Sequence, residues 1–81
     1  MFTNGFIMND MPRFLTLPDV AEILNVNLPQ VRALVRSGAL LGVQIGGRGV
    51  WRVEDVELEA YIQRAYAETK KRIHAGVDVE D

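Results

Sequence analysis

Apolar side chains recur at intervals of three and four residues in two short segments near the start of the chain. The first set is Leu17, Val20, Ala21 and Leu24, and the second set is Leu28, Val31, Leu34 and Val35. Because an α-helix turns once in about 3.6 residues, each set lies on one face of an amphipathic helix. The pattern therefore predicts two short helices, over residues 16–25 and 27–37, that bury these faces.

Polar residues mark where the two helices begin and end. Thr16 and Asn27 can accept a hydrogen bond from the first turn, and a proline follows each of them two residues later. Gln30 takes the third position of a capping box. Asn25 can adopt the left-handed conformation that ends a helix, and Gly38 is a strong stop signal for the second one. A three-residue turn is therefore predicted to join the helices.

Residues 41–53 alternate as the two strands of a β-hairpin. On the first strand, Leu41, Val43 and Ile45 fall on one side and Gly42 and Gln44 on the other. On the return strand, the expected inward positions are Trp51 and Val53, and the outward ones are Val50 and Arg52. We accordingly place Trp51 in the core, in preference to the alternative that its ring stacks on a DNA base. Three glycines within residues 46–49 permit the positive φ values of a tight hairpin tip.

A third and longer helix is expected from about Glu54 to Ile73. The acids in its first turn favour the positive end of the helix dipole. One side of it carries Leu58, Tyr61, Ile62, Ala65, Tyr66, Thr69 and Ile73. Twenty residues span roughly 30 Å, which is more than two short helices and a hairpin need as cover. We therefore expect the extension 63–75 to project or to meet another surface.

Length and composition are those of one small domain. The chain has 81 residues, of which 48% are hydrophobic. We expect a disordered tail over 1–12, the domain over 13–75 and an acidic tail over 76–81. The absence of cysteine excludes disulfides, thiolate metal sites and thiol catalysis. The start lacks the basic and apolar segments of a signal peptide, so we expect a cytoplasmic location, with Met8 and Met11 as alternative start sites.

Charge is unevenly distributed along the chain. The net charge is −2, yet residues 13–52 contain five arginines and two acidic residues, which gives this region +3. Residues 53–75 carry −1 in total. A locally basic region on an acidic molecule predicts attraction to phosphates at that region. Because a charge of +3 is modest, we expect the non-specific affinity for DNA to be weak.

The second helix and the hairpin offer candidate contacts with double-stranded DNA. On the helix, the face opposite the apolar stripe consists of Pro29, Ala33 and Arg36, flanked by Gln30 and Arg32. This face is flat at its centre, which suits close approach to a groove. At the hairpin tip, Arg48 is expected to contact phosphate or the minor groove. The candidate DNA-binding residues are Gln30, Arg32, Ala33, Arg36, Gly47, Arg48 and Arg52.

Some of these features have simpler interpretations. Arg52 could instead pair with Glu54 or Asp55. The run Gly46–Gly49 lacks the lysine and the serine or threonine of a phosphate-binding loop, so a hairpin tip explains it better. The acids at 54–59 fit a helix start better than a metal site or paired catalytic carboxylates. We expect no catalytic residue, metal or cofactor, and therefore no enzyme.

The run FLTLPDVAEILNVNLPQVRALVRSGAL, followed by VQIGGRGVWRVEDVELEAYI, resembles the excisionase-type, MerR-like winged helix-turn-helix DNA-binding domains. The resemblance covers roughly residues 14–62. It implies a mainly α-helical fold with a small β-hairpin: helix, turn, helix, two-stranded wing and long C-terminal helix. It also implies that the second helix reads a DNA groove through Gln30–Arg36, and that Gly46–Arg52 is the wing. The extension 63–75 lies beyond the matched part.

The sequence thus favours a small sequence-specific DNA-binding protein that regulates transcription. Helix 27–37 would read the major groove, and the wing 46–52 would contact the backbone or the minor groove. One alternative is a recombination directionality factor of the excisionase kind, or a nucleoid accessory factor. Another is an adaptor that binds a protein through the long C-terminal helix. The expected partners are double-stranded DNA and a second copy of the chain, as a homodimer or as cooperative neighbours on DNA through that helix, and no membrane.

Overall fold

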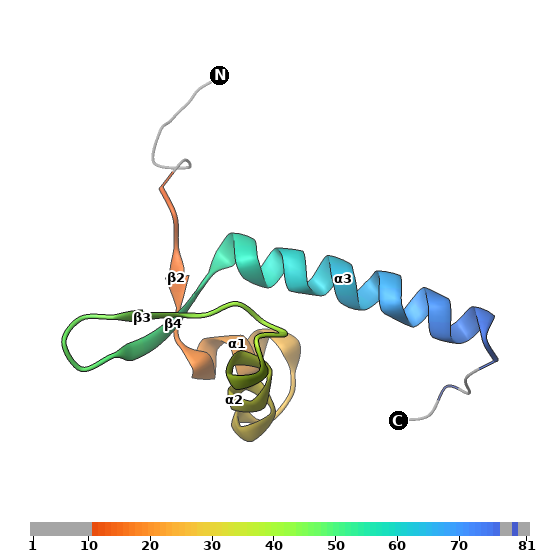
Figure 1. Cartoon of the computed structure of the whole chain (residues 1–81), viewed down its shortest axis with the longest axis horizontal. Helices are drawn as coiled ribbons and strands as arrows, with labels where there is room; N and C mark the ends of the chain where they lie inside the picture. The colour runs from red at the N-terminus through yellow and green to blue at the C-terminus, as the bar shows by residue number, and fades with distance from the viewer. Residues whose placement is uncertain (1–10, 77–78, 80–81) are drawn as a thin grey trace, which may run out of the picture.

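The computed structural model describes residues 11–76 and 79. Its elements, in chain order, are β2 (Phe14–Leu15), α1 (Leu17–Leu24), α2 (Leu28–Ser37), β3 (Val43–Ile45), β4 (Val50–Glu54) and α3 (Asp55–His74). The fold is mainly helical with a small antiparallel hairpin, which confirms the winged helix-turn-helix layout (Figure 1). Most of the tail predicted over 1–12 and of the one over 76–81 lies outside the described residues.

Both short helices begin with reciprocal capping bonds, of which the sequence predicts the acceptor role of Thr16 and the capping box of Asn27 and Gln30. The Oγ1 of Thr16 accepts a hydrogen bond from the backbone N–H of Asp19 at 3.0 Å, and the Asp19 carboxylate accepts from the N–H of Thr16. Asn27 and Gln30 repeat this arrangement at the start of α2. At the other end, Asn25 has the left-handed φ of 57° that allows the chain to leave α1. The helix ends predicted from the sequence are therefore confirmed.

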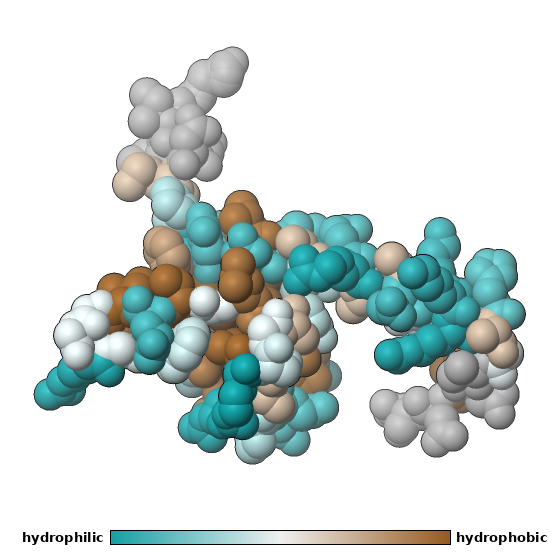
Figure 2. All heavy atoms as spheres, viewed as in Figure 1, coloured by the Kyte–Doolittle hydropathy of each residue, from teal (hydrophilic) through white to brown (hydrophobic). Residues whose placement is uncertain are grey.

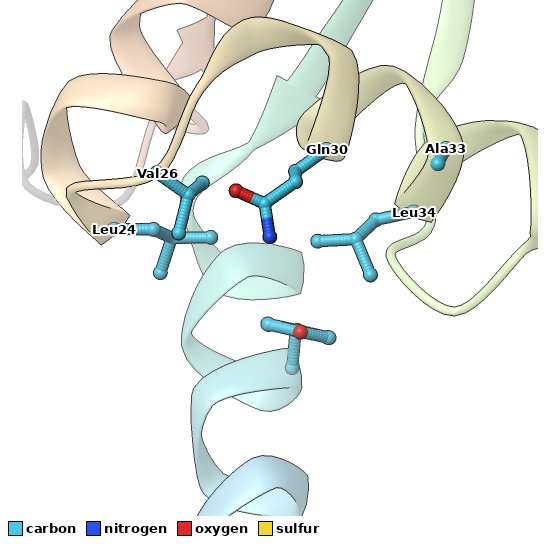
Figure 3. A pocket seen from close by; sticks show the side chains of 6 residues that line it. Leu24, Val26, Gln30, Ala33 and Leu34 are labelled. Carbon is cyan, nitrogen blue, oxygen red and sulfur yellow. The ribbon is translucent and has the colours of Figure 1, made fainter. Parts of the chain in front are cut away.

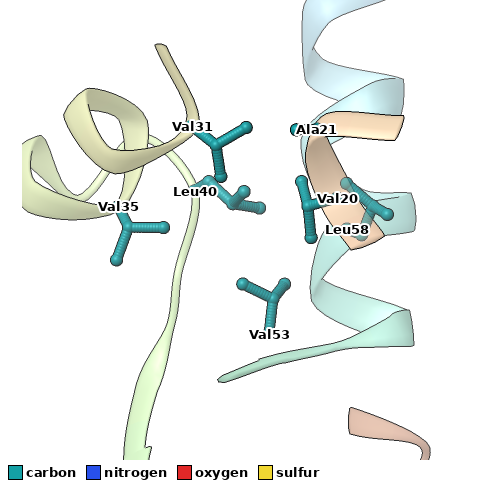
Figure 4. Close-up of a cluster of buried hydrophobic side chains, with 7 residues drawn as sticks. All are labelled: Val20, Ala21, Val31, Val35, Leu40, Val53 and Leu58. Atoms are coloured by element: carbon teal, nitrogen blue, oxygen red, sulfur yellow. The ribbon is translucent and has the colours of Figure 1, made fainter. Parts of the chain in front are cut away.

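The core lies where α1, α2, the base of the hairpin and the first turns of α3 meet (Figure 4). Its members are Val20, Ala21, Val31, Val35, Leu40, Val53 and Leu58. Leu40 is fully buried although it belongs to neither helix. Gly38, with a φ of 84°, reverses the chain after α2, and the N–H of Leu40 then donates to the carbonyl of Leu34. This turn places the Leu40 side chain beneath α2.

The sheet has three strands in the order β2-β4-β3, all antiparallel. The hairpin β3–β4 is the predicted wing, and its first strand begins at Val43, two residues later than the predicted start at Leu41. Strand β2 was not predicted. It has two residues, pairs Leu15 with Val53, and is continued by a hydrogen bond from the N–H of Asp55 to the carbonyl of Arg13.

The wing corrects the prediction that Trp51 belongs to the core. Trp51 remains 40% exposed, whereas Val53, two residues further along the same face, is fully buried. Only the base of the hairpin packs against the helices, and its tip extends away from them (Figure 1). Side chains nearer the tip are therefore not covered by the core. Directly paired residues of an antiparallel ladder share a face. Trp51 accordingly shares its face with Gln44.

The opposite face of the wing is apolar and exposed. It carries Val43, Ile45, Val50 and the partly buried Arg52, and Phe14 of the neighbouring strand β2 lies on the same face of the sheet. Figure 2 shows hydrophobic atoms gathered along the upper side of the hairpin in this view, with hydrophilic atoms at its tip. The sheet therefore buries one face only near its base.

Helix α3 packs on the core through its first half and then projects away from it (Figure 1). Leu58 is buried and Tyr61 and Ile62 are partly buried, while Tyr66 is 69% and Ile73 55% exposed. The Nη2 of Arg64 donates to the carbonyl of Ala39 at 3.1 Å and ties the middle of α3 to the end of the helix-turn-helix unit. The prediction that α3 outreaches the core is thus confirmed. In the described part of the chain, no helix combines the length and the apolar character that crossing a membrane requires.

Candidate nucleic-acid interface

The solvent side of α2 carries the residues that were predicted to approach DNA. Val31 and Val35 are buried against the core, which turns the opposite side of the helix outward. All four candidates on this helix are exposed, namely Gln30, Arg32, Ala33 and Arg36. The helical period alone therefore placed them correctly on the surface.

The structure divides these four residues between two flanks of α2. Gln30 and Ala33 line a pocket of about 490 Å³ that faces α3 and includes Tyr61 (Figure 3). Arg32 and Arg36 line a smaller hollow of about 190 Å³ between α2 and the wing. The two arginines are thus brought together beside the wing, and Gln30 lies apart from them.

The amide of Gln30 is also engaged within the protein. Its Oε1 accepts from the backbone N–H of Asn27 at 3.4 Å, as the capping box requires. Figure 3 shows the amide beside Leu24 and Leu34, above α3. Contact between this side chain and a base would compete with the cap of its own helix.

Three of the candidate arginines donate no side-chain hydrogen bond within the described part of the protein. Among the described residues, the arginine side chains that donate a hydrogen bond are Arg52 and Arg64. Arg32, Arg36 and Arg48 are exposed. Their guanidinium donors therefore face solvent and are available to an anionic partner.

The wing presents its two arginines differently. Arg48 lies in the tip, next to Gly47, in a turn that a hydrogen bond from the N–H of Gly49 to the carbonyl of Gly46 closes at 3.1 Å. Arg52 lies on the apolar outer face, where its Nη1 donates to the carbonyl of Trp51 at 2.7 Å. The structure therefore places Arg52 on the face of the wing that points away from Arg32 and Arg36. The suggested pairing of Arg52 with a carboxylate of 54 or 55 does not occur among the described residues.

Trp51 is a residue of this surface that the sequence analysis placed in the core. It lines the hollow between α2 and the wing together with Leu17, Arg32, Val35 and Arg36. Gly42 permits this arrangement, because a Cβ at that position would lie 3.0 Å from Val35 Cγ1 and 3.2 Å from Trp51 Cε3. The missing side chain of Gly42 was the signal that α2 and the wing approach each other closely here.

The comparison with protein families decides what kind of domain carries these features. Residues 14–66, which is more than half of the chain, match the family model described as a helix-turn-helix domain. The chain belongs to the helix-turn-helix domain family. Comparison with curated proteins and with solved structures found no match. Membership in this family supports a DNA-binding role, with α1 and α2 as the two helices of the motif.

The family match also delimits the helix-turn-helix domain. It begins at Phe14, the first residue of β2, and ends at Tyr66, so it includes the wing and the packed half of α3. The rest of α3, from residue 67 to His74, lies beyond the match. The resemblance of residues 14–62 to helix-turn-helix domains is thereby confirmed.

Proposed function

We propose that this helix-turn-helix protein is a sequence-specific DNA-binding protein that regulates transcription. Helix α2 inserts its exposed side into the major groove, and the wing contacts the backbone or the minor groove. The observation that carries this proposal is the pair Arg32 and Arg36, exposed on α2 beside a wing whose tip carries a third free arginine.

The chemistry of these side chains fits the proposal. An arginine can donate two hydrogen bonds to the O6 and N7 atoms of guanine, and the methyl group of Ala33 can lie against a thymine methyl. Arg48 at the tip suits a phosphate or a narrow minor groove. Gly47 lets the backbone of the tip approach closely, and Arg52 would reach the DNA backbone only from the outer face of the wing. Gln30 contributes only if its amide leaves the capping box.

Selection from random duplexes, followed by binding titrations on the best and on scrambled sequences, tests this proposal. We expect an enriched motif and affinity for it well above that for scrambled DNA. Salt-dependent binding without any enriched motif would favour the nucleoid accessory role. A motif that confers binding together with strong DNA bending would favour the excisionase-like role. No binding to any duplex would leave only the adaptor and would contradict a DNA-binding function.

A second proposal concerns pairing through the projecting half of α3. Tyr66 and Ile73 are exposed there, beyond the residues that the core needs. Residues 54–59 carry four carboxylates and no base, whereas residues 64–72 carry four bases and one carboxylate. Two α3 helices in antiparallel arrangement would therefore set unlike charges against each other.

Analytical ultracentrifugation with and without a duplex of two half-sites tests this pairing. Tyr66→Glu should abolish the paired species or the cooperative binding, while Ala67→Glu on the neighbouring position serves as the matched control. A strict monomer that binds singly and is unaffected by Tyr66→Glu would contradict the pairing. Monomeric protein that binds no DNA but retains a protein partner through α3 would support the adaptor instead.

A further inference from the structure

The hollow between α2 and the wing lies where a strand of DNA backbone must pass if the proposed function holds. A helix in the major groove and a hairpin tip at the adjacent minor groove sit on opposite sides of one sugar–phosphate chain. The concave surface that joins helix and hairpin then faces that chain. In this protein the concave surface is the hollow of about 190 Å³ lined by Leu17, Arg32, Val35, Arg36 and Trp51.

The lining of this hollow suits a phosphate group held against an apolar floor. Leu17 is partly buried and Val35 is buried, and both lie at the junction of the core with the wing. Arg32 and Arg36 supply positive charge from the α2 side. Trp51 closes the hollow from the β4 side with 40% of its surface exposed. It is therefore the neutral side chain of the hollow that can donate a hydrogen bond.

The contact between Trp51 and Gly42 involves the Cε3 atom of the indole ring. Its Cε3 atom lies on the side of Gly42, 3.2 Å from the position where a Cβ would stand. In an indole, Cε3 and Nε1 lie on opposite edges of the fused rings, and Nε1 is not among the three heavy atoms nearest to the Cβ position of Gly42. Among residues 11–76 and 79, the hydrogen bonds of the wing side chains involve Gln44 and Arg52, and none involves this N–H.

We propose that Trp51 is a DNA-contacting residue whose Nε1–H donates a hydrogen bond to a phosphate oxygen seated in this hollow. The neighbouring guanidinium groups of Arg32 and Arg36 provide the positive potential that holds the phosphate there. The inference rests on the proposed DNA-binding function and adds a backbone contact to it. A fully buried tryptophan could not reach a phosphate. A fully exposed one would lack the packing against Gly42 and Val35 that fixes the position of the Trp51 ring.

A neutral donor leaves a different signature from that of an arginine. Because no cation is removed, replacement of Trp51 should lower affinity without changing the dependence on salt concentration. Because phosphates are alike in all sequences, it should lower affinity equally for the best and for scrambled duplexes. The unchanged salt slope separates a Trp51 contact from a loss of charge, and the equal loss on both duplexes separates it from a contact that reads the base sequence.

The test is Trp51→Phe in the full chain, measured by titration on the selected duplex at several salt concentrations. Phenylalanine keeps an aromatic ring against Gly42 and loses the N–H. We expect about a ten- to hundredfold loss of affinity, since a hydrogen bond to a charged group is at stake, with an unchanged salt slope. Ile45→Val, on the opposite face of the same hairpin, is the matched control and should bind as the original chain does.

A second measurement does not depend on any variant. Trp51 is the only tryptophan of the chain, so its emission should change when the duplex binds. A Trp51→Phe protein with full affinity, or unchanged tryptophan emission in the saturated complex, would overturn the inference. An original chain that binds no duplex would instead overturn the proposed function, so the two failures are distinguishable.

The contacted phosphate can then be identified. Single methylphosphonate substitutions along the selected duplex remove the charge and one acceptor at one position at a time. One of them should weaken the original chain more than it weakens Trp51→Phe, because only the original chain loses the indole hydrogen bond as well as the attraction of Arg32 and Arg36. Equal effects of every substitution on both proteins would show that Trp51 contacts no phosphate and would overturn the inference.

Discussion

The α1–α2 unit and the wing differ in how their structure is determined, although each is built from two short segments. In α1–α2, both ends of each helix are capped, and the apolar stripes meet in one core. In the wing, the buried face ends at Val53, while the other face leaves three apolar side chains exposed, Val43, Ile45 and Val50. Local hydrogen bonds and periodicity therefore define the first unit, whereas the position of the wing relative to its neighbours defines the second.

The difference matters for function because the two units use their exposed sides differently. The α2 surface holds its arginines on a rigid helix whose orientation is set by Val31 and Val35. The wing carries Arg48 on a glycine-rich tip outside the core. We expect changes in the first unit to affect folding and base preference, and changes in the second to affect general affinity.

The largest effect is expected for Leu40→Ala, which removes a fully buried side chain beneath α2. Truncation of such a residue costs about 2–5 kcal/mol, which is a large part of the stability of a small domain. Ile45→Ala on the outer face of the wing should cost less than about 1 kcal/mol. Chemical denaturation followed by circular dichroism measures both. Equal losses at the two positions would contradict the difference between the units.

The contrast also explains how far the sequence could predict this molecule. Caps, stripes and turn residues involve neighbours within four positions, so the three helices, the hairpin and the exposed α2 face could be predicted. Strand β2 could not, because two residues carry no periodicity and their pairing with β4 is a long-range contact. Leu40 was overlooked because its burial depends on the turn at Gly38.

Within the candidate site, the sequence predicted which residues are exposed but not how they group. The helical period places Gln30, Arg32, Ala33 and Arg36 on one broad side. The division into two flanks depends on where α3 and the wing pack, which no local pattern contains. Trp51 was misplaced for the same reason. Alternation predicts on which face of a strand a side chain lies, but it does not predict how far along the strand the core covers that face.

The next largest effect is expected for Trp51→Ala, at the boundary between the two units. Truncation of a buried aromatic costs about 3–5 kcal/mol, and the exposed 40% of this side chain reduces the expected loss to about 2–3 kcal/mol. The variant should therefore remain folded at 25 °C with a lower melting temperature, as followed by circular dichroism. Complete unfolding would mean that the wing is as much a part of the core as α1 and α2 are.

Arg36→Ala and Arg32→Ala test the α1–α2 unit, with a smaller expected change in free energy. Each should weaken binding to the best duplex by about 1–3 kcal/mol, and at least one should relax the preference at a base pair. Repeating the selection with each variant measures this directly, and thermal denaturation verifies that both remain folded. Full affinity and an unchanged motif in both variants would remove α2 from the proposed interface.

The smallest effect is expected for Arg48→Ala at the tip of the wing. One arginine that neutralises one phosphate contributes about one unit to the slope of log affinity against log salt concentration. The variant should therefore bind best and scrambled duplexes with similar modest losses and with a slope that is flatter by about one unit. Stability should be unchanged, because the side chain is exposed and lies outside the core.

Two controls make this measurement decisive for the comparison between the units. Arg48→Lys keeps the charge and should restore the slope. Arg13→Ala removes an exposed arginine that precedes β2 and lines no part of the hollow between α2 and the wing. If Arg48→Ala instead loses discrimination between duplexes at an unchanged slope, the tip reads bases. The wing would then share the role assigned to α2, and the functional division between the two units would be wrong.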